Sequence, residues 1–465
     1  MSAGTGALPA AEELVERALR AAGGDRCLVL VEDGSSAELR YANNTTTTNG
    51  QRRDRRVSVA RVVPSAGGLA VGTASASGAA VAVEELVAAA EADARAAPPA
   101  EDAAPLLEGP ALPDFGEPAV RTELAAFAPL ADALAAAFEA ARRRGDVLAG
   151  FATHEVTTTY LASSTGLRRR HVDATGTFEL AARSADGATA WAGRSLGSME
   201  EVDVAAVAAR LSQRLAWSGR RIELPAGRYE VILPPDAVAD LVIPLAEAAS
   251  GRDAEDGWNV FSSPSGGTRL GERLVETPFD LRSDPNEDGL ECIPFLATAA
   301  SDADVSVFDN GAPLGATRWI DGGRLSRLRY HRAGAARAGT AFTPPVDNLV
   351  LALDGASAGL DELVAGTRRG LLLTCLWYLR EVDVSTLLLT GLTRDGVYLV
   401  EDGEVVGAVN NFRFNESPLD VLGRAVEVGR TERALSREWG EWMRRSAMPS
   451  LRVAEFNMSS VSPAS

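Results

Sequence analysis

The chain contains no lysine, so all 46 of its basic residues are arginines. Arginine stays protonated in proteins and does not act as an amine nucleophile. The sequence therefore excludes Schiff-base catalysis, a Ser-Lys dyad and a Walker A phosphate loop, because each of these needs a lysine.

Cysteine and histidine are also scarce, with three residues of each among 465. The three cysteines, Cys27, Cys292 and Cys375, are far apart and form neither a disulfide framework nor a CxxC metal motif. The N-terminal segment lacks the basic and apolar parts of a secretion signal. No apolar run approaches the ~20 residues that a membrane helix needs. We therefore expect a cytoplasmic protein that does not act at a membrane.

Acidic residues outnumber basic ones, which gives a net charge of -18, and they are scattered along the chain. Such a chain repels nucleic acid, because nucleic-acid binding depends on neutralising phosphates. Two short arginine clusters, 51–61 and 166–171, lie beside strand-like segments. We interpret them as solvated strand faces or partner contacts, and we predict no nucleic-acid partner.

Periodicity and turn signals divide the chain into three regions. Residues 1–118 combine helices and strand-like runs and end in an acidic, proline-rich linker. Residues 119–225 hold a long amphipathic helix, further strands and a second helix. Residues 226–465 begin with a strand and a helix (236–250), pass through the mostly irregular stretch 251–345, and return to strands. The pattern predicts an α+β fold.

One pair of residues, His154 and Glu155, resembles the start of a zinc-protease helix. A zincin needs a second histidine four residues after the first, but position 158 is threonine, and the next histidine is His171. The surrounding residues are β-branched or aromatic, which favours a strand. We therefore predict that the pair lies on a strand and binds no metal.

Two side chains are candidate nucleophiles. Ser357 lies in "GASAG", which matches the GxSxG elbow between a strand and a helix. However, an α/β-hydrolase has its catalytic histidine after the serine, and every histidine of this chain precedes Ser357. Cys375 lies in the apolar run "LLLTCLWYL", where a core position is expected, and no histidine is an evident base for it.

Several segments, in order along nearly the whole chain, resemble the TldD/PmbA family of bacterial and archaeal peptidase proteins. These segments are "LRYANNTTTTNGQRRDRRVSV", "ASSTGL", "ETPFD", "VFDNGAPLG", "TGLTRDGVYLVEDGEVVGAVNNFRFNES" and "MPSLRVAEFNMSS". The resemblance implies an N-terminal mixed α/β domain followed by a larger, β-rich C-terminal domain. It also implies a complex of two related subunits.

In the TldD-like subunit of this family, a HExxxH helix and a cysteine near the C-terminus hold zinc. The matching helix of this chain, "DAVADLVIPLAEAASGRD", contains Glu247 but no histidine, and no cysteine follows Cys375. The chain is therefore most similar to the PmbA (TldE) subunit, which lacks the metal ligands. The resemblance implies that this chain has no catalytic or metal-binding residues and no cofactor, and that zinc resides in the partner subunit.

We therefore expect a non-catalytic subunit that contributes to a substrate chamber, binds peptides, and forms a heterodimer with a zinc-binding, TldD-like partner. A homodimer of the isolated chain is an open possibility. The expected substrate-cleft residues are Trp377, Tyr378, Arg380, Arg394 and Asp395. Two alternatives remain, an autonomous hydrolase with an unrecognised serine or cysteine site and a peptide-binding scaffold.

Overall fold

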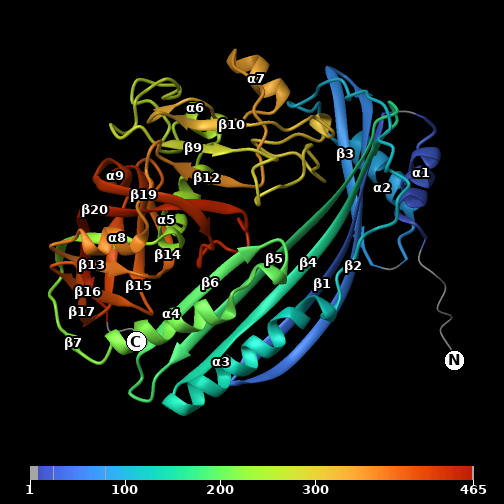
Figure 1. Ribbon diagram of the computed structural model, residues 1–465. Coiled ribbons are helices and arrows are strands. Elements are labelled where there is room, and N and C mark those ends of the chain that lie inside the picture. Colours follow the sequence, from blue (N-terminus) through green and yellow to red (C-terminus); the bar gives the residue numbers. More distant parts are fainter. Residues whose placement is uncertain (1–8, 25, 79, 463–465) are drawn as a thin grey trace.

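The computed structural model describes residues 9–24, 26–78 and 80–462. It has an α+β fold in which a long, helix-backed sheet precedes a larger, β-rich region. Figure 1 shows the long strands running obliquely beside the C-terminal region, with α1 and α2 near one end and α3 near the other. This confirms the predicted fold class.

The N-terminal sheet has six antiparallel strands in the order β3-β2-β1-β4-β5-β6. Its strands are β1 (Cys27–Ala42), β2 (Thr45–Ser65), β3 (Gly68–Ser77), β4 (Val147–Ser163), β5 (Arg168–Arg183) and β6 (Thr189–Leu196). Because β1 pairs with β4 along most of its length, the regions 1–118 and 119–225 share one sheet. The sheet therefore continues across the boundary that the sequence analysis placed at residue 118.

The turn between β1 and β2 fixes the far end of this sheet. Asn43 and Asn44 adopt positive φ angles of 52° and 59°, which asparagine tolerates better than most residues. The Asn44 side chain accepts a hydrogen bond from the Leu148 backbone N–H (2.7 Å) and donates one to the Asp146 carbonyl (2.8 Å). The turn thereby holds β1 in register with the start of β4.

All the helices of the N-terminal half pack on one face of the sheet. Alternate residues of β1, such as Val29, Val31 and Tyr41, are buried against them, as expected from the two-residue repeat of a strand. The intervening residues, such as Leu28 and Leu30, face the C-terminal region. The helices are α1 (Ala11–Ala21), α2 (Val83–Ala96), η1 (Leu124–Leu130), α3 (Ala131–Arg144), η2 (Met199–Glu201) and α4 (Val204–Trp217).

The stretch Leu124–Arg144, formed by η1 and α3, is long and apolar enough to span a membrane by length and composition. The sequence analysis did not anticipate this. Its large apolar side chains Phe127, Leu130, Leu134 and Phe138 are buried in the core between the helices and the sheet. The exposed side chains are alanines, one proline and charged residues, so the same stretch also fits an amphipathic helix that packs on a core.

The C-terminal region is built on a mixed sheet with β20 near its centre and α5 (Pro235–Glu247) buried in the main core. The path runs β11-β10-β9-β12-β20-β8-β13-β16-β17-β7, with β14, β15, β18 and β19 attached beside it. Its strands are β7 (Arg221–Ile222), β8 (Gly227–Leu233), β9 (Asp280–Ser283), β10 (Thr317–Asp321), β11 (Arg324–Leu325), β12 (Leu349–Ala352), β13 (Arg369–Leu373), β14 (Leu376–Asp383), β15 (Leu388–Thr393), β16 (Val397–Glu401), β17 (Glu404–Val409), β18 (Phe412–Glu416), β19 (Ala425–Ala434) and β20 (Ser446–Val461). Its other helices are α6 (Gly251–Glu255), η3 (Val307–Asp309), α7 (Arg332–Ala338), α8 (Leu360–Ala365) and α9 (Pro418–Gly423).

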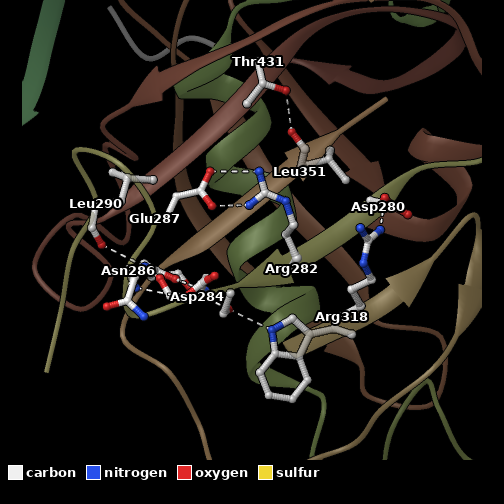
Figure 2. Close-up of polar contacts among 12 residues, drawn as sticks. Asp280, Arg282, Asp284, Asn286, Glu287, Leu290, Arg318, Leu351 and Thr431 are labelled. Carbon is white, nitrogen blue, oxygen red and sulfur yellow. Dashed lines mark hydrogen bonds and ion pairs between the residues drawn. The ribbon is translucent and has the colours of Figure 1, made fainter. Parts of the chain in front are cut away.

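Polar side chains hold together the stretch that was predicted to be mostly irregular. Figure 2 shows the two hydrogen bonds between Arg282 and Glu287, one of them 2.8 Å long, and the ion pair between Arg318 and Asp280. The Trp319 indole N–H, from β10, donates to a serine hydroxyl on β9 at 2.9 Å. These side chains form hydrogen bonds and ion pairs with one another, so they stabilise the short strands β9 and β10. They are therefore not a set of unpaired side chains that could bind a ligand.

Candidate functional site

A cleft of about 1130 Å³ lies between one end of the N-terminal sheet, near Arg40 and Gly150, and the C-terminal region. One wall is the face of the sheet opposite the helices, and the other is β14 together with the segment 435–445 that joins β19 to β20. Its charged and aromatic lining residues are Glu38, Arg40, Phe151, Glu155, Glu179, Trp191, Trp377, Tyr378, Arg380, Arg437, Glu438, Glu441, Trp442 and Arg444.

Two aspartates on α5, the half-buried Asp236 and the buried Asp240, hold the segment 435–445 in place. Asp236 accepts a hydrogen bond from the Leu435 backbone N–H at 3.0 Å. Asp240 accepts one from the Ser436 hydroxyl at 2.6 Å and one from the Glu438 backbone N–H at 3.0 Å. The aspartates are four residues apart, which places both on the same face of the helix.

Burial changes the acidity of both aspartates. It raises the pKa of Asp240 to about 8, although the hydrogen bonds from Ser436 and Glu438 oppose the rise. It also raises the pKa of Asp236, against the effect of nearby arginines such as Arg194. The carboxyl group of Asp240 is therefore largely protonated at neutral pH.

The other end of this segment is attached to the N-terminal sheet. Arg444 forms an ion pair with Glu155 on β4 at 2.6 Å, and its carbonyl accepts a hydrogen bond from Ser195 on β6. Arg445 forms ion pairs with Asp173 on β5 and with Asp347 at 2.9 Å. The segment therefore bridges the two halves of the molecule beneath the cleft.

Arg437 lies within the cleft wall between two tryptophan rings. Its guanidinium carbon is 5.1 Å from the ring centroid of Trp191 and 4.8 Å from that of Trp377. It also forms an ion pair with Asp395 and donates a hydrogen bond to the Cys375 sulfur at 2.9 Å. A cation stacked on tryptophan in this way is stabilised by the ring quadrupoles.

The structure brings three of the five predicted cleft residues together on β14. Trp377, Tyr378 and Arg380 line the cleft. Asp395 lies behind the wall as the partner of Arg437, whereas Arg394 is not among the lining residues. Their role in substrate binding stays a prediction.

Tyr378 has an unusual backbone conformation, with φ at 55°. A bulky residue is strained there, and such strain is found at functional sites more often than elsewhere. The Tyr378 backbone N–H donates to Glu438 at 2.7 Å, and Glu438 also pairs with Arg380 at 2.7 Å. The Arg380 guanidinium lies 4.3 Å from the centroid of the Tyr378 ring. These contacts hold a half-exposed aromatic ring at the cleft.

Sequence analysis missed the segment that closes the cleft. It did not single out Arg437, Glu438, Glu441 or Trp442, nor Glu179 on β5. The signal that could have found most of them is the run "SREWGEWMRR", which concentrates tryptophan, glutamate and arginine between two strands. Exposed aromatic and charged residues in a loop favour a binding role.

The other candidates take up structural positions. His154 lies on β4 as predicted, and its ring nitrogens bond to the Thr122 hydroxyl at 2.6 Å and to the Gly197 carbonyl at 3.2 Å. Cys375 is buried, and burial raises its pKa to about 12, so the thiol holds its proton at neutral pH. Ser357 is exposed in the turn before α8, and none of the described hydrogen bonds joins it to a histidine.

Within residues 9–24, 26–78 and 80–462, no group of three or more His, Cys, Asp or Glu side chains is arranged to hold a metal ion. In particular, the face of α5 that carries Asp236 and Asp240 is covered by the segment 435–445. The cleft therefore offers aromatic and charged side chains for binding.

Comparison with known proteins identifies this architecture as that of a metallopeptidase-related α+β protein. Residues 226–460 match the PmbA/TldA metallopeptidase C-terminal domain, and the chain belongs to the PmbA/TldA family. No match was found among curated protein sequences.

Solved structures share the fold over almost the whole chain. TldE from Thermococcus kodakarensis aligns with a TM-score of 0.75 at 16% identity, covering 96% of this chain and 99% of its own. A proposed modulator of DNA gyrase from Thermotoga maritima aligns with a TM-score of 0.75 at 17% identity and the same coverage. A similarly described protein from Bacteroides thetaiotaomicron aligns with a TM-score of 0.73 at 16% identity, covering 97% and 99%. At these identities the likeness shows the fold.

Proposed function

We propose that this chain is the subunit without metal ligands of a TldD/TldE-type metallopeptidase complex, and that it holds peptide for a zinc-binding partner. The proposal rests on which side chains α5 carries and what they contact. In the family resemblance, zinc ligands stand on the matching helix of the other subunit type. Here that helix has no histidine, and its aspartates Asp236 and Asp240 accept hydrogen bonds from the segment 435–445.

The protonation of Asp240 supports the same proposal. A metal ion is held by ionised carboxylates, thiolates and neutral imidazoles, usually four ligands for zinc. Asp240 has a pKa raised to about 8, and its Oδ1 already accepts two hydrogen bonds. It is therefore a poor ligand, and the zinc and the activated water of the reaction would come from the partner.

The cleft supports a role in holding peptide. Among the described strands, β14 is paired with β15 alone, so its other edge has no strand partner. An extended peptide that adds to such an edge gains main-chain hydrogen bonds whatever its sequence. Trp377 and Tyr378, at the start of this strand, supply aromatic surface for side chains.

The alternatives have weaker support. An autonomous serine hydrolase would need a base beside Ser357, and a cysteine hydrolase would need a thiolate at Cys375, whose pKa is raised to about 12. A peptide-binding scaffold would use the same cleft but would have no proteolytic partner. We place the complex in the cytoplasm, with peptides as substrates.

Co-purification and hydrolysis test the proposal together. The chain is produced alone and with a HExxxH-bearing family member encoded beside it, and zinc, iron and manganese are measured by elemental mass spectrometry. We expect almost no metal and no hydrolysis of an unstructured peptide with the lone chain, and chelator-sensitive hydrolysis with the pair.

Either of two results would contradict the proposal. One is about one metal ion bound per lone chain. The other is hydrolysis by the lone chain in excess chelator, and the variants Ser357→Ala and Cys375→Ala would then show which nucleophile acts. Gel filtration of the lone chain also tests whether it forms a homodimer.

A further inference from the structure

The charged side chains of the cleft are mostly paired with one another. Four arginines line it, and each has a carboxylate partner within the protein. The pairs are Arg40 with Glu38, Arg444 with Glu155 at 2.6 Å, Arg380 with Glu438 at 2.7 Å, and Arg437 with Asp395. The opposite charges within each pair cancel, so these pairs give the cleft little net charge.

Two glutamates remain without an ion pair among the described residues, Glu179 on β5 and Glu441 in the segment 435–445. Glu179 is half-buried, and one of its oxygens accepts a hydrogen bond from the Trp191 indole N–H at 2.9 Å. Glu441 is exposed and takes part in no described hydrogen bond. The cleft therefore has an excess of negative charge from the opposite sides of its opening.

The two carboxylates influence each other. Burial raises the pKa of Glu179, and the nearby charge of Glu441 adds to the rise, while the Trp191 hydrogen bond and the charge of Arg437 oppose it. Like charges near each other are unfavourable, and the Arg437 cation that opposes this at Glu179 is already paired with Asp395. A cation placed between them would relieve this repulsion.

Aromatic rings stand beside these carboxylates. Trp442, next to Glu441 in the chain, is 70% exposed, and its ring centroid lies 5.3 Å from that of Trp439. An exposed tryptophan held in place by another ring is a favourable surface for a guanidinium or ammonium group. Arg437 shows this chemistry in the same cleft, because it stacks on Trp191.

We propose that the cleft selects peptides that carry an arginine or lysine side chain, and that Glu179 and Glu441 receive the cation. The inference rests on the proposed function in one respect, the binding of peptide in this cleft. It adds a charge preference to the sequence-independent main-chain contacts. All the residues involved belong to this chain, so the preference does not require the partner subunit.

Binding of defined peptides to the full chain tests this inference. The probe is a hexapeptide, acetylated and amidated at its ends, with one arginine among small neutral residues. The comparison peptide has citrulline, the neutral isostere, in place of arginine. Affinity is measured by calorimetry or tryptophan fluorescence at low and high salt. We expect the arginine peptide to bind about tenfold more tightly at low salt, since a charge-assisted hydrogen bond and a cation–π contact are both lost with citrulline.

Matched variants locate the effect. Glu441→Gln and Glu179→Gln should each reduce the preference for arginine by about threefold or more. Glu404→Gln changes the net charge equally, but Glu404 is exposed at the start of β17, outside the cleft, and the preference should stay the same. Circular dichroism of each variant confirms that it is folded.

The possible failures are distinguishable. Equal affinity for the arginine and citrulline peptides overturns the charge preference and leaves peptide holding intact. An equal loss with Glu404→Gln and Glu441→Gln overturns the assignment to this site, because it shows an effect of net charge. A citrulline peptide with a free N-terminal amine that binds as tightly as the arginine peptide overturns the selection of a side chain, because it shows that the cleft takes a terminal amine instead. Binding of no peptide at all contradicts the proposed function itself.

Discussion

The N-terminal sheet meets the C-terminal region along one face, but the two ends of this contact differ. At the first end, which we call the apolar junction, Leu28 and Val62 pack against Val307 and Phe308. At the second end, the cleft, charged and aromatic side chains surround about 1130 Å³ of space. The same strand, β1, supplies both, with Leu28 in the junction and Glu38 in the cleft.

The apolar junction and the cleft differ in how their structure is stabilised. Burial of apolar area stabilises the contact at the apolar junction, where Leu28, Val62, Val307 and Phe308 are all buried. The cleft keeps its shape through ion pairs and through the aspartates of α5, which hold the segment 435–445. Strain is also found on this side, at Tyr378. One end therefore joins the two halves through apolar contacts, and the other joins them through ion pairs of the segment 435–445 and leaves a cleft between them.

The largest effect is expected at the apolar junction. Phe308 is 1% exposed and packs with Leu28 and Val62. Phe308→Ala should lower the free energy of unfolding by about 3–5 kcal/mol, because it removes buried contacts and leaves a cavity. Urea unfolding followed by circular dichroism measures the change.

The control is Trp442→Ala in the cleft. Trp442 is 70% exposed, so its loss should change the free energy of unfolding by less than about 1 kcal/mol. If Trp442→Ala were as destabilising as Phe308→Ala, the cleft would be a structural junction like the other end, and the contrast would be wrong.

Much of the fold could be predicted from local patterns. The strand around His154 was predicted from β-branched residues, and the helix with Asp236 and Asp240 from its apolar periodicity. The pairing of β1 with β4 could not be predicted in this way, because Glu32 and Thr159, which are opposite each other, are 127 residues apart. A two-residue repeat shows which side chains share a face but not which distant strand lies beside them.

The cleft was only partly predictable for the same reason. Trp377, Tyr378 and Arg380 lie within one short stretch of a single strand, so the sequence of that stretch points to them. Glu38 and Glu441 come from opposite ends of the chain and line the same cleft only in the folded protein. The absence of histidine on α5 needed no structure, whereas the hydrogen bonds that Asp240 accepts could not be read from the sequence.

The second prediction compares two arginines within the cleft. Arg437→Met should lower the free energy of unfolding by about 2–3 kcal/mol, because it leaves Asp395 with only its longer ion pair to Arg394, at 3.7 Å, and Trp191 without its stacked partner. Arg380→Met should cost less than about 1 kcal/mol, because the Arg380 side chain is 54% exposed. Thermal and urea unfolding of both variants measure the difference. Equal losses of unfolding free energy would show that Arg437, stacked between tryptophans, contributes no more stability than Arg380 in its exposed ion pair.

The third prediction concerns pH and Asp240. Its pKa is raised from 3.8 to about 8 in the folded protein, so the folded state holds a proton that the unfolded state releases. This contribution to stability is complete below about pH 4 and is lost as the pH rises to about 8. Asp236 and Glu438, the neighbouring carboxylates, oppose ionisation of Asp240.

Asp240→Asn keeps an oxygen that accepts from Ser436 and Glu438 but removes the titration. The stability difference between variant and parent should therefore shift in favour of the variant, by more than about 1 kcal/mol, between pH 5 and pH 9. Urea unfolding at several pH values measures it. Parallel curves for the two proteins would show that Asp240 is ionised throughout, and the segment 435–445 would then be held by a charged group.

The smallest effect on stability is expected at Tyr378. Glycine adopts the observed φ of 55° without strain, so Tyr378→Gly should relieve about 1 kcal/mol of backbone strain. This gain offsets part of the stability that is lost with the contact between the ring and Arg380. The net change in the free energy of unfolding should stay below about 1 kcal/mol, while peptide affinity falls because the cleft loses an aromatic surface. Tyr378→Ala loses the same ring but keeps the strained backbone, so it should be less stable than the glycine variant. An alanine variant as stable as the glycine one would show that the strand relaxes once the ring is gone. The ring, and not the bond from the Tyr378 N–H to Glu438, would then hold this part of the cleft in its strained form.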